Sequence, residues 1–488
     1  MEVQELLKLY AAHPQVTALD TLLKNDTSRN IFLKGLNGSG PAMTIASLFT
    51  KGRGSYVCVL NDQEEAGYFY HDLMQLTASD EVYFFPSAYR RAIKYGHVDP
   101  ANEILRTEVL SRLQDPDASF VIVTYPDALA ERVVAREVLK ENTLKISVGE
   151  KLDNMFVSDV LDEYGFEQVD YVYEPGQYAL RGSILDVFSF SNEFPYRIDF
   201  FGDEVETIRT FDVETQLSKE KLDSIYIVPE MSKNAKDSTS LLGSLPRNTC
   251  IAARDLAWCK ERIGSVWNDD PVVADEESFA DIDQMRKKLV RGEDFLREVL
   301  DFRRIHFGAR PMGTADATIH FSTQTQPIYH KNFDRVSESF HKYLDEGYTL
   351  YILSDQEKQA NRIRMIFEDR GDNIPFTAVN RTIHEGFADD TLRICFFTDH
   401  QLFDRFHKFN LKSDKARSGK ITLSLKELNQ FSQGDYIVHI DHGVGQFGGL
   451  VRTEVNGKMQ EAIKLIYQNN DIIFVSIHSL HKLSKYKG

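Results

Sequence analysis

The sequence predicts a multi-domain α/β protein, and three observations predict it. The chain has 488 residues, which is too long for a single hydrophobic core, and its 42% hydrophobic and 27% charged residues are ordinary for a globular protein. Short apolar runs alternate with helical patterns up to about residue 125, which indicates a parallel, doubly wound sheet. The last stretch of the chain holds closely spaced strands separated by turn residues, which is typical of a small β-barrel.

Composition excludes several classes of protein. No apolar run approaches the roughly 20 residues that cross a bilayer, and the first residues are acidic where a signal peptide is basic, so we expect a cytoplasmic protein without membrane contact. The four cysteines are far apart and show no C-x-x-C spacing, so we expect buried free thiols. A net charge of −17 argues against a nucleic-acid sheath and favours protein partners.

A glycine-rich turn organises the N-terminal domain. An apolar run precedes Gly35, Gly38 and Gly40, and a helical pattern follows, which is the layout of a phosphate-binding loop between a strand and a helix. In the G-x-x-x-x-G-K-[ST] pattern, however, Pro41 stands at the lysine position and Ala42 at the hydroxyl position. This loses the cation, the magnesium ligand and one backbone N–H donor. We therefore predict a degenerate, inactive phosphate loop, with no catalytic residue, cofactor or metal in this chain.

The same turn allows one alternative hypothesis. Gly38 and Gly40 partly follow the G-x-G-x-x-G pattern of a dinucleotide-dependent oxidoreductase, and Asp62 lies about 20 residues further on, where the ribose partner is found. Met43 replaces the third glycine, and no proton-transfer residues accompany the pattern. Titration with NAD by calorimetry would separate the two hypotheses.

Changes of pattern along the chain predict six segments. Strand-like runs with one helix, beginning near residue 139, indicate a mainly antiparallel α+β insertion, after which the first domain is completed. A second small α/β unit follows, and the sequence does not indicate its role. The predicted segments are 1–135 (degenerate phosphate-loop domain, first part), 136–209 (insertion), 210–313 (second part of the first domain), 314–405 (small α/β domain), 406–430 (basic linker) and 431–488 (barrel).

The last segment is predicted to contain five strands, at 436–439, 445–450, 451–455, 461–467 and 472–476. His439, Asp441 and His442 fall across one of the intervening turns, and turn chemistry is preferred there to a metal site because no third or fourth ligand is close in sequence.

Three stretches resemble one family. The glycine turn, the strands at 178–188 and 196–206, and the segment at 434–445 resemble the bacterial transcription-repair coupling factors (Mfd), whose N-terminal part is similar to the repair protein UvrB. The resemblance implies a RecA/UvrB-like domain with a UvrA-binding insertion, an α/β domain without a well-established role, and a Tudor-like barrel that binds the β subunit of RNA polymerase.

The family's ATP-driven DNA translocation belongs to RecA-like motor domains, whose motifs do not occur in this sequence. We therefore expect the chain to be the N-terminal scaffold that links stalled RNA polymerase to UvrA in nucleotide excision repair, without enzyme activity of its own. DNA contact is expected mainly through the absent motor domains. The aromatic hairpin with which UvrB holds damaged DNA is reduced here to the segment 84–91, so damage binding is not expected.

The resemblance also implies contact residues. Arg181 matches an arginine of the UvrA-binding strand, and Phe188 and Arg197 are further candidates for UvrA contact. Ile463 and Leu465 are candidates for polymerase contact if the strand 461–467 lies at a sheet edge, where free backbone N–H and C=O groups can pair with a strand of polymerase.

Overall fold

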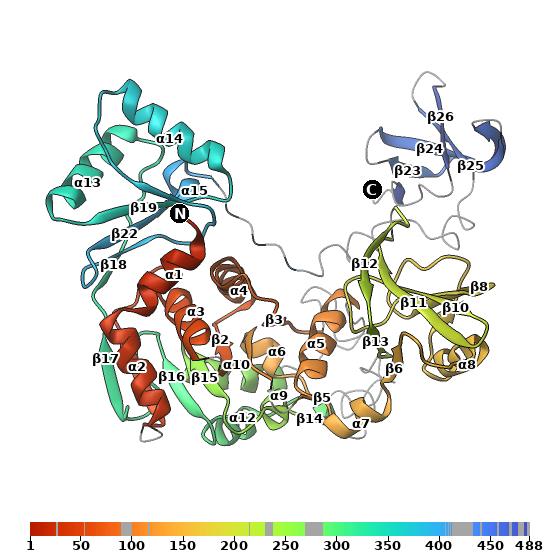
Figure 1. Ribbon diagram of the computed structural model, residues 1–488, viewed down its shortest axis with the longest axis horizontal. Coiled ribbons are helices and arrows are strands. Elements are labelled where there is room, and N and C mark those ends of the chain that lie inside the picture. Colours follow the sequence, from red (N-terminus) through yellow and green to blue (C-terminus); the bar gives the residue numbers. More distant parts are fainter. Residues whose placement is uncertain are drawn as a thin grey trace. The chain divides into compact units, whose positions relative to one another are not determined.

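The structure is a computed structural model (Figure 1). It describes residues 1–25, 28–52, 54–88, 100–115, 118–213, 215–229, 238–268, 286–405, 407, 409, 411, 433–439, 442–455, 458–467, 471–476 and 483–485. The predicted linker 406–430 lies almost entirely outside these residues, and residues 89–91 of the reduced hairpin lie outside them as well. Within the described part of the chain, no helix is both long and apolar enough to cross a membrane.

The prediction of a mixed α/β fold is confirmed. The chain divides into two compact units, one made of Met1–Lys140 with Ser232–Leu411 and the other of Glu141–Met231 with Lys412–Gly488. The first unit holds a large parallel sheet and a second, smaller α/β module. All four cysteines are buried and free, as predicted.

A seven-stranded parallel sheet forms the centre of the first unit. Its strand order is β17-β1-β16-β15-β2-β4-β3, and every pairing is parallel. β2 and β4 are buried along their whole length, as expected where helices cover both faces. The strands are β1 (Asn30–Lys34), β2 (Ser55–Val59), β3 (Val82–Phe85), β4 (Phe120–Thr124), β15 (Cys250–Ala253), β16 (Arg303–His306) and β17 (Ala317–His320).

The helices and the short two-stranded sheet around this large sheet come from both sides of the insertion. They are α1 (Val3–Ala11), α2 (Pro14–Lys24), α3 (Gly40–Gly52), α4 (Gln63–Thr77), α5 (Pro100–Arg112), α6 (Pro126–Leu129), α7 (Arg136–Glu141), α9 (Leu241–Ser244), α10 (Leu256–Asn268), α12 (Gly292–Val299), and β5 (Val133–Val134) paired with β14 (Ser238–Thr239). β16 and β15 lie between β1 and β2 in the sheet, so the chain returns to the first module after the insertion.

The second α/β module is built on a five-stranded sheet in the order β18-β21-β22-β19-β20. β19 is parallel to β20 and β22, whereas β21 is antiparallel to both of its neighbours. Phe340, Phe367 and Phe397 lie in its core, between the helices and the sheet. The elements are β18 (Thr323–Thr325), α13 (Phe333–Asp345), β19 (Thr349–Leu353), α14 (Glu357–Asp369), β20 (Thr377–Val379), β21 (Phe387–Asp389), β22 (Ile394–Thr398) and α15 (Asp399–Leu402).

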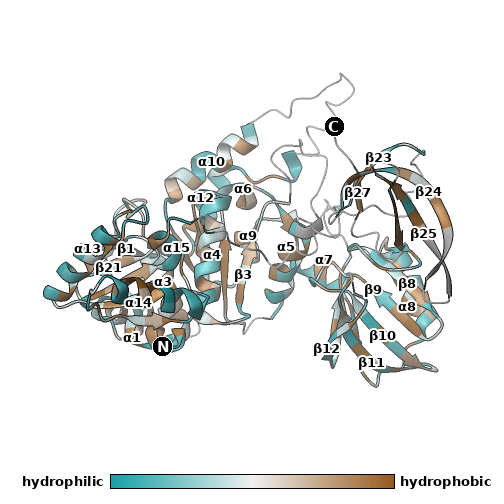
Figure 2. Ribbon diagram, turned by 90° about the horizontal axis from the view of Figure 1, so that it is seen from above, coloured by the Kyte–Doolittle hydropathy of each residue, from teal (hydrophilic) through white to brown (hydrophobic). Residues whose placement is uncertain are grey.

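The inserted module in the second unit is a six-stranded sheet in the order β12-β11-β10-β9-β8-β7. Its pairings are antiparallel except that between β7 and β8. In Figure 2, hydrophilic and hydrophobic residues alternate along β10 and β11, which is the pattern of a sheet with one buried face. The elements are β6 (Leu144–Ser147), α8 (Asn154–Glu163), β7 (Glu167–Gln168), β8 (Gln177–Arg181), β9 (Ile184–Val187), β10 (Tyr196–Phe201), β11 (Glu204–Phe211), β12 (Ser218–Leu222) and β13 (Ser224–Ile227).

The C-terminal module is a five-stranded antiparallel sheet in the order β26-β25-β24-β23-β27. The two strands predicted at 445–450 and 451–455 form one strand, β24, whose register shifts between Phe447 and Leu450. Among the described residues no pairing joins β26 to β27, so barrel closure stays a prediction. The strands are β23 (Tyr436–His439), β24 (Gly443–Val455), β25 (Lys458–Ile466), β26 (Ile472–Ser476) and β27 (Leu483–Lys485).

Candidate functional site

The sheet of the inserted module separates an apolar face from a charged face. Side chains such as Leu185, Tyr196 and Ile198 lie in a core with α8. Because successive residues of a strand point to opposite faces, their neighbours Asp186 and Arg197 share the other face. The register places Asp186 of β9 between Ala179 of β8 and Arg197 of β10.

Asp186 joins the two arginines predicted from the sequence. Its carboxylate is fully buried and accepts hydrogen bonds from Arg197 Nε at 2.7 Å, from an Arg197 terminal nitrogen at 2.8 Å and from an Arg181 terminal nitrogen at 2.5 Å. The hydrogen bonds to Asp186 raise the pKa of the Arg197 guanidinium above its usual value. Asp186 was not among the site residues predicted from the sequence. Its signal was an acidic residue inside the otherwise apolar run of β9.

The two arginines differ in what they can offer to a partner. The Arg197 side chain is 15% exposed, lies over the Phe211 ring and also donates to the Gln216 side chain, so it is held inside the module. The Arg181 side chain is 34% exposed, donates to the Asp170 backbone carbonyl and lies 5.0 Å from the centre of the Tyr171 ring. Arg181 is therefore the arginine that an approaching protein can reach.

A second charge pair continues the same face. Arg209 of β11 stands opposite Arg197 and pairs with Asp199 of β10, which also accepts a hydrogen bond from the Thr207 hydroxyl. The module also carries exposed apolar side chains, among them Phe201 at the end of β10 and Leu217 just before β12. Charged groups held by buried partners beside exposed apolar groups suit a protein surface rather than a small substrate. Phe188, in contrast, is only 1% exposed, so in this structure it is a core residue.

The glycine turn lies between β1 and α3, as the strand–turn–helix pattern predicts. Gly35 and Gly38 have positive φ angles of 89° and 52°, and α3 begins at Gly40. Pro41 and Ala42 are buried in the first turn of this helix. Asp62, the ribose partner in the alternative hypothesis, uses its side chain to cap α4 by accepting a hydrogen bond from Glu65 N.

In the C-terminal module, Ile463 and Leu465 are fully buried. Their strand, β25, pairs with β24 on one side and β26 on the other, so the edge position on which the predicted contact depended is not found. Exposed apolar side chains occur instead at Ile472 and Phe474 of β26. The role of Ile463 and Leu465 in polymerase contact stays a prediction, and their position makes it an indirect one.

The structure describes the turn near residue 440 only in part. The His439 and His442 rings lie 4.6 Å apart, and Asp441 lies outside the described residues. Throughout the described ranges, no group of three or more His, Cys, Asp or Glu residues is placed to hold a metal ion.

Comparisons with known proteins match both modules of the second unit. Residues 144–232 match the UvrB interaction domain, and residues 431–487 match the CarD-like/TRCF RID domain. Transcription-repair-coupling factor of Staphylococcus aureus (strain bovine RF122 / ET3-1) is 23% identical over 96% of this chain and 47% of its own length. The protein of the same name from Escherichia coli (strain K12) is 22% identical over 93% of this chain and 45% of its own length.

The chain thus spans about half the length of the relatives it matches. The two matched domains contain the predicted candidates Arg181, Arg197, Ile463 and Leu465. The resemblance to the transcription-repair coupling factors is therefore confirmed, and the chain corresponds to the region of these factors that carries the UvrB interaction and RID domains.

Proposed function

We propose that this chain is a scaffold of transcription-repair coupling, which binds UvrA through the inserted module and RNA polymerase through the C-terminal module. The observation that carries the proposal is the presence of these two matched domains in one chain that is related to transcription-repair coupling factors over nearly its whole length. In the full-length protein, ATP-driven DNA translocation would be the task of motor domains outside this sequence. The chain itself works by protein contact and not by catalysis.

Arg181 is the proposed centre of the UvrA contact. Its guanidinium donates a hydrogen bond to the Asp186 carboxylate and lies over the ring of Tyr171. A positioned guanidinium loses little side-chain entropy when it donates to a partner's carboxylate or backbone carbonyl. Arg197 contributes by holding Asp186 in place, and Phe188, which is buried, would contribute indirectly.

The proposed polymerase contact is the β26 edge of a Tudor-like barrel. Within the described residues β26 pairs only with β25, and its exposed side chains Ile472 and Phe474 flank the free edge. A strand of the polymerase β subunit could add to this edge by backbone hydrogen bonds, with the apolar side chains giving specificity. Ile463 and Leu465 would support this edge from the core.

The experiment is a pair of pull-downs with purified UvrA and purified RNA polymerase. Arg181→Ala is expected to weaken capture of UvrA and leave capture of polymerase unchanged, whereas Phe474→Asp is expected to do the reverse. Arg247→Ala is the matched control, because Arg247 is exposed in the other unit and pairs with Asp301 at the surface. Equal capture of UvrA by the Arg181→Ala and Arg247→Ala variants would refute the proposed UvrA site.

A further inference from the structure

The backbone of the second α/β module lies against the glycine turn. The Ser39 N–H donates to the Glu385 carbonyl at 3.1 Å, and the Glu385 N–H donates back to Ser39 Oγ at 3.0 Å. Ser39 Oγ in turn donates to the carboxylate of Asp72 on α4 at 2.5 Å, and this carboxylate also accepts from the His384 N–H at 2.7 Å. Ser39 of the turn and Asp72 of α4 therefore hydrogen-bond to the backbone of His384 and Glu385, two consecutive residues of the second module.

The glycines of the turn permit this close approach. A Cβ added to Gly38 would lie 2.8 Å from the Gly386 carbonyl oxygen, and one added to Gly35 would lie 2.2 Å from the Phe321 carbonyl oxygen. Both distances are shorter than real Cβ atoms show, and both glycines have positive φ angles. A phosphate-binding loop needs glycine so that backbone can approach a phosphate, but here the approaching group is another backbone.

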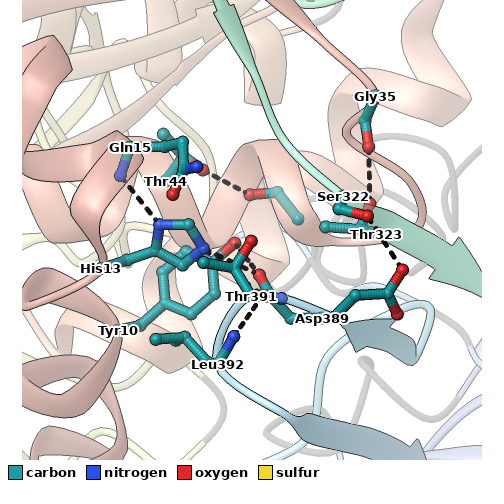
Figure 3. A network of polar contacts seen from close by, with 12 residues as sticks. Tyr10, His13, Gln15, Gly35, Thr44, Ser322, Thr323, Asp389, Thr391 and Leu392 are labelled. Atoms are coloured by element: carbon teal, nitrogen blue, oxygen red, sulfur yellow. Dashed lines mark hydrogen bonds and ion pairs between the residues drawn. The ribbon is translucent and has the colours of Figure 1, made fainter.

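Further contacts hold the modules together, and Figure 3 shows those between Thr323 and Gly35 and between His13 and Asp389. The Thr323 hydroxyl donates to the Gly35 carbonyl at 2.8 Å, and Asn37 N–H donates to the same hydroxyl at 2.9 Å. On the other side of α3, the buried His13 ring places Nε2 3.1 Å from the buried Asp389 carboxylate. His13 Nδ1 accepts from the Gln15 N–H, which leaves Nε2 as the nitrogen that donates to Asp389.

The space beside the turn is unsuited to a triphosphate. A hollow of about 450 Å³ is lined there by the turn, the start of α4 and the second module. The one lining arginine, Arg254, is paired with Glu65 at 2.8 Å. Five acidic side chains line the hollow, those of Asp62, Glu64, Glu65, Asp72 and Glu385. The net negative charge would repel an anionic ligand.

We propose that the glycine turn is a docking site for the second α/β module, whose segment 382–386 takes the place that a nucleotide phosphate holds in an active phosphate loop. This gives the second α/β module a role that the sequence does not indicate. Its segment 382–386 stays bound at the degenerate phosphate loop and so joins the two α/β modules into one body. Thr382 and Ile383 are buried at the start of the segment, which anchors it. The proposal does not depend on the partners of the inserted and C-terminal modules.

Hydrogen exchange measured by mass spectrometry on the whole chain tests the docking. Gly38→Ala is expected to speed exchange of the amides in 382–386 by at least about tenfold, while the amides of β2 and β4 keep their wild-type rates. Gly347→Ala is the matched control, because Gly347 has φ 82° but nothing within 4 Å of an added Cβ. Wild-type exchange of 382–386 in the Gly38→Ala variant, or the same acceleration in the control, would overturn the proposal.

Ser39→Ala provides a second variant in case Gly38→Ala does not fold. It removes the oxygen that accepts from Glu385 N–H and donates to Asp72, so exchange of the Glu385 amide is expected to rise by up to about tenfold. Unchanged exchange of this amide would contradict the docking.

Calorimetric titration of the Pro41→Lys/Ala42→Thr variant with magnesium and ATP tests the occupancy. The variant restores the missing lysine and hydroxyl, yet we expect no saturable heat while 382–386 stays in place. Saturable ATP binding by this folded variant would show that the site is not occupied and would refute the inference. This outcome would leave the proposed UvrA and polymerase contacts untouched.

Discussion

Asp186→Asn tests whether a buried carboxylate organises the charged face of the inserted module. The substitution keeps the shape of the side chain but removes its charge and replaces one acceptor oxygen with a donor that faces two guanidinium groups. Arg197 is mostly buried, so its charge loses the carboxylate that neutralises it. Arg181 is one-third exposed, so its guanidinium can hydrogen-bond to water instead. Removing one partner from a buried ion pair lowers the free energy of unfolding by about 3–5 kcal/mol. Because Arg181 is partly exposed, we expect a smaller loss of about 2–4 kcal/mol for Asp186→Asn.

Hydrogen exchange of the amides in β8, β9 and β10 measures this loss where it occurs. Both tryptophans, Trp258 and Trp267, lie in the other unit, so tryptophan fluorescence would not report on this sheet. A loss of 2–4 kcal/mol corresponds to exchange that is roughly 30- to 1000-fold faster. The variant should also capture less UvrA, because Arg181 loses the group that positions it.

Asp199→Asn is the matched control on the same face. Its carboxylate is 17% exposed and its partner Arg209 is 31% exposed, so the expected loss is about 1 kcal/mol or less. The reasoning would be refuted if the Asp186→Asn variant kept wild-type protection. It would also be refuted if both substitutions had equal effects, because burial would then not decide the energy.

Three further predictions concern the other modules. Burial lowers the pKa of His71 to about 4, so between pH 6.5 and 4 the unfolded chain binds a proton at His71 that the folded chain does not. As the pH falls through this range, His71 alone should lower the free energy of unfolding by at most about 1.4 kcal/mol per pH unit. Burial lowers the pKa of His306, His384 and His400 to about 4 as well, so His71→Gln should reduce, but not abolish, the fall in melting temperature between pH 7 and 5. Gly35→Ala should destabilise the first unit by about 3 kcal/mol or more in chemical denaturation, whereas Gly347→Ala should cost about 1 kcal/mol, because only the first meets a carbonyl oxygen as well as positive φ. Leu465→Arg should unfold the C-terminal module, so both its β-sheet circular dichroism signal and polymerase binding should be lost. Phe474→Asp changes an exposed side chain and should lose polymerase binding alone. A folded Leu465→Arg variant would contradict the placement of Leu465 in the core.

The parallel sheet could be predicted because several of its strands are almost entirely apolar. A strand such as β2 or β4 is covered on both faces, and this leaves a continuous hydrophobic run in the sequence. The order of strands could not be predicted in the same way. Neither periodicity nor composition says that β15 and β16 enter between β1 and β2, since this depends on contacts between segments far apart in the chain.

For the candidate sites too, features set by the local sequence could be predicted, and features set by contacts between distant segments could not. Arg181 and Arg197 could be named as candidates from the sequence because a long local motif surrounds them. Asp186, which joins them, could not be named, because cross-strand register decides its position. Likewise, alternation in β25 distinguishes Ile463 and Leu465 from their neighbours but does not say whether the strand lies at an edge. The glycine pattern around Gly35 indicates close approach of another group, and the sequence alone does not name the group.

The pairing of β1 with β16 and β17 has a consequence for synthesis of the protein. β1 ends at Lys34, but its neighbours in the sheet are β16 and β17, which leave the ribosome roughly 270 residues later. At a translation rate of about 5–20 residues per second, the apolar segment Asn30–Lys34 waits roughly 15–50 s for its hydrogen-bonding partners. A nascent chain of this kind exposes an unpaired hydrophobic strand throughout that interval, which makes it a natural client for chaperones that bind at the ribosome exit.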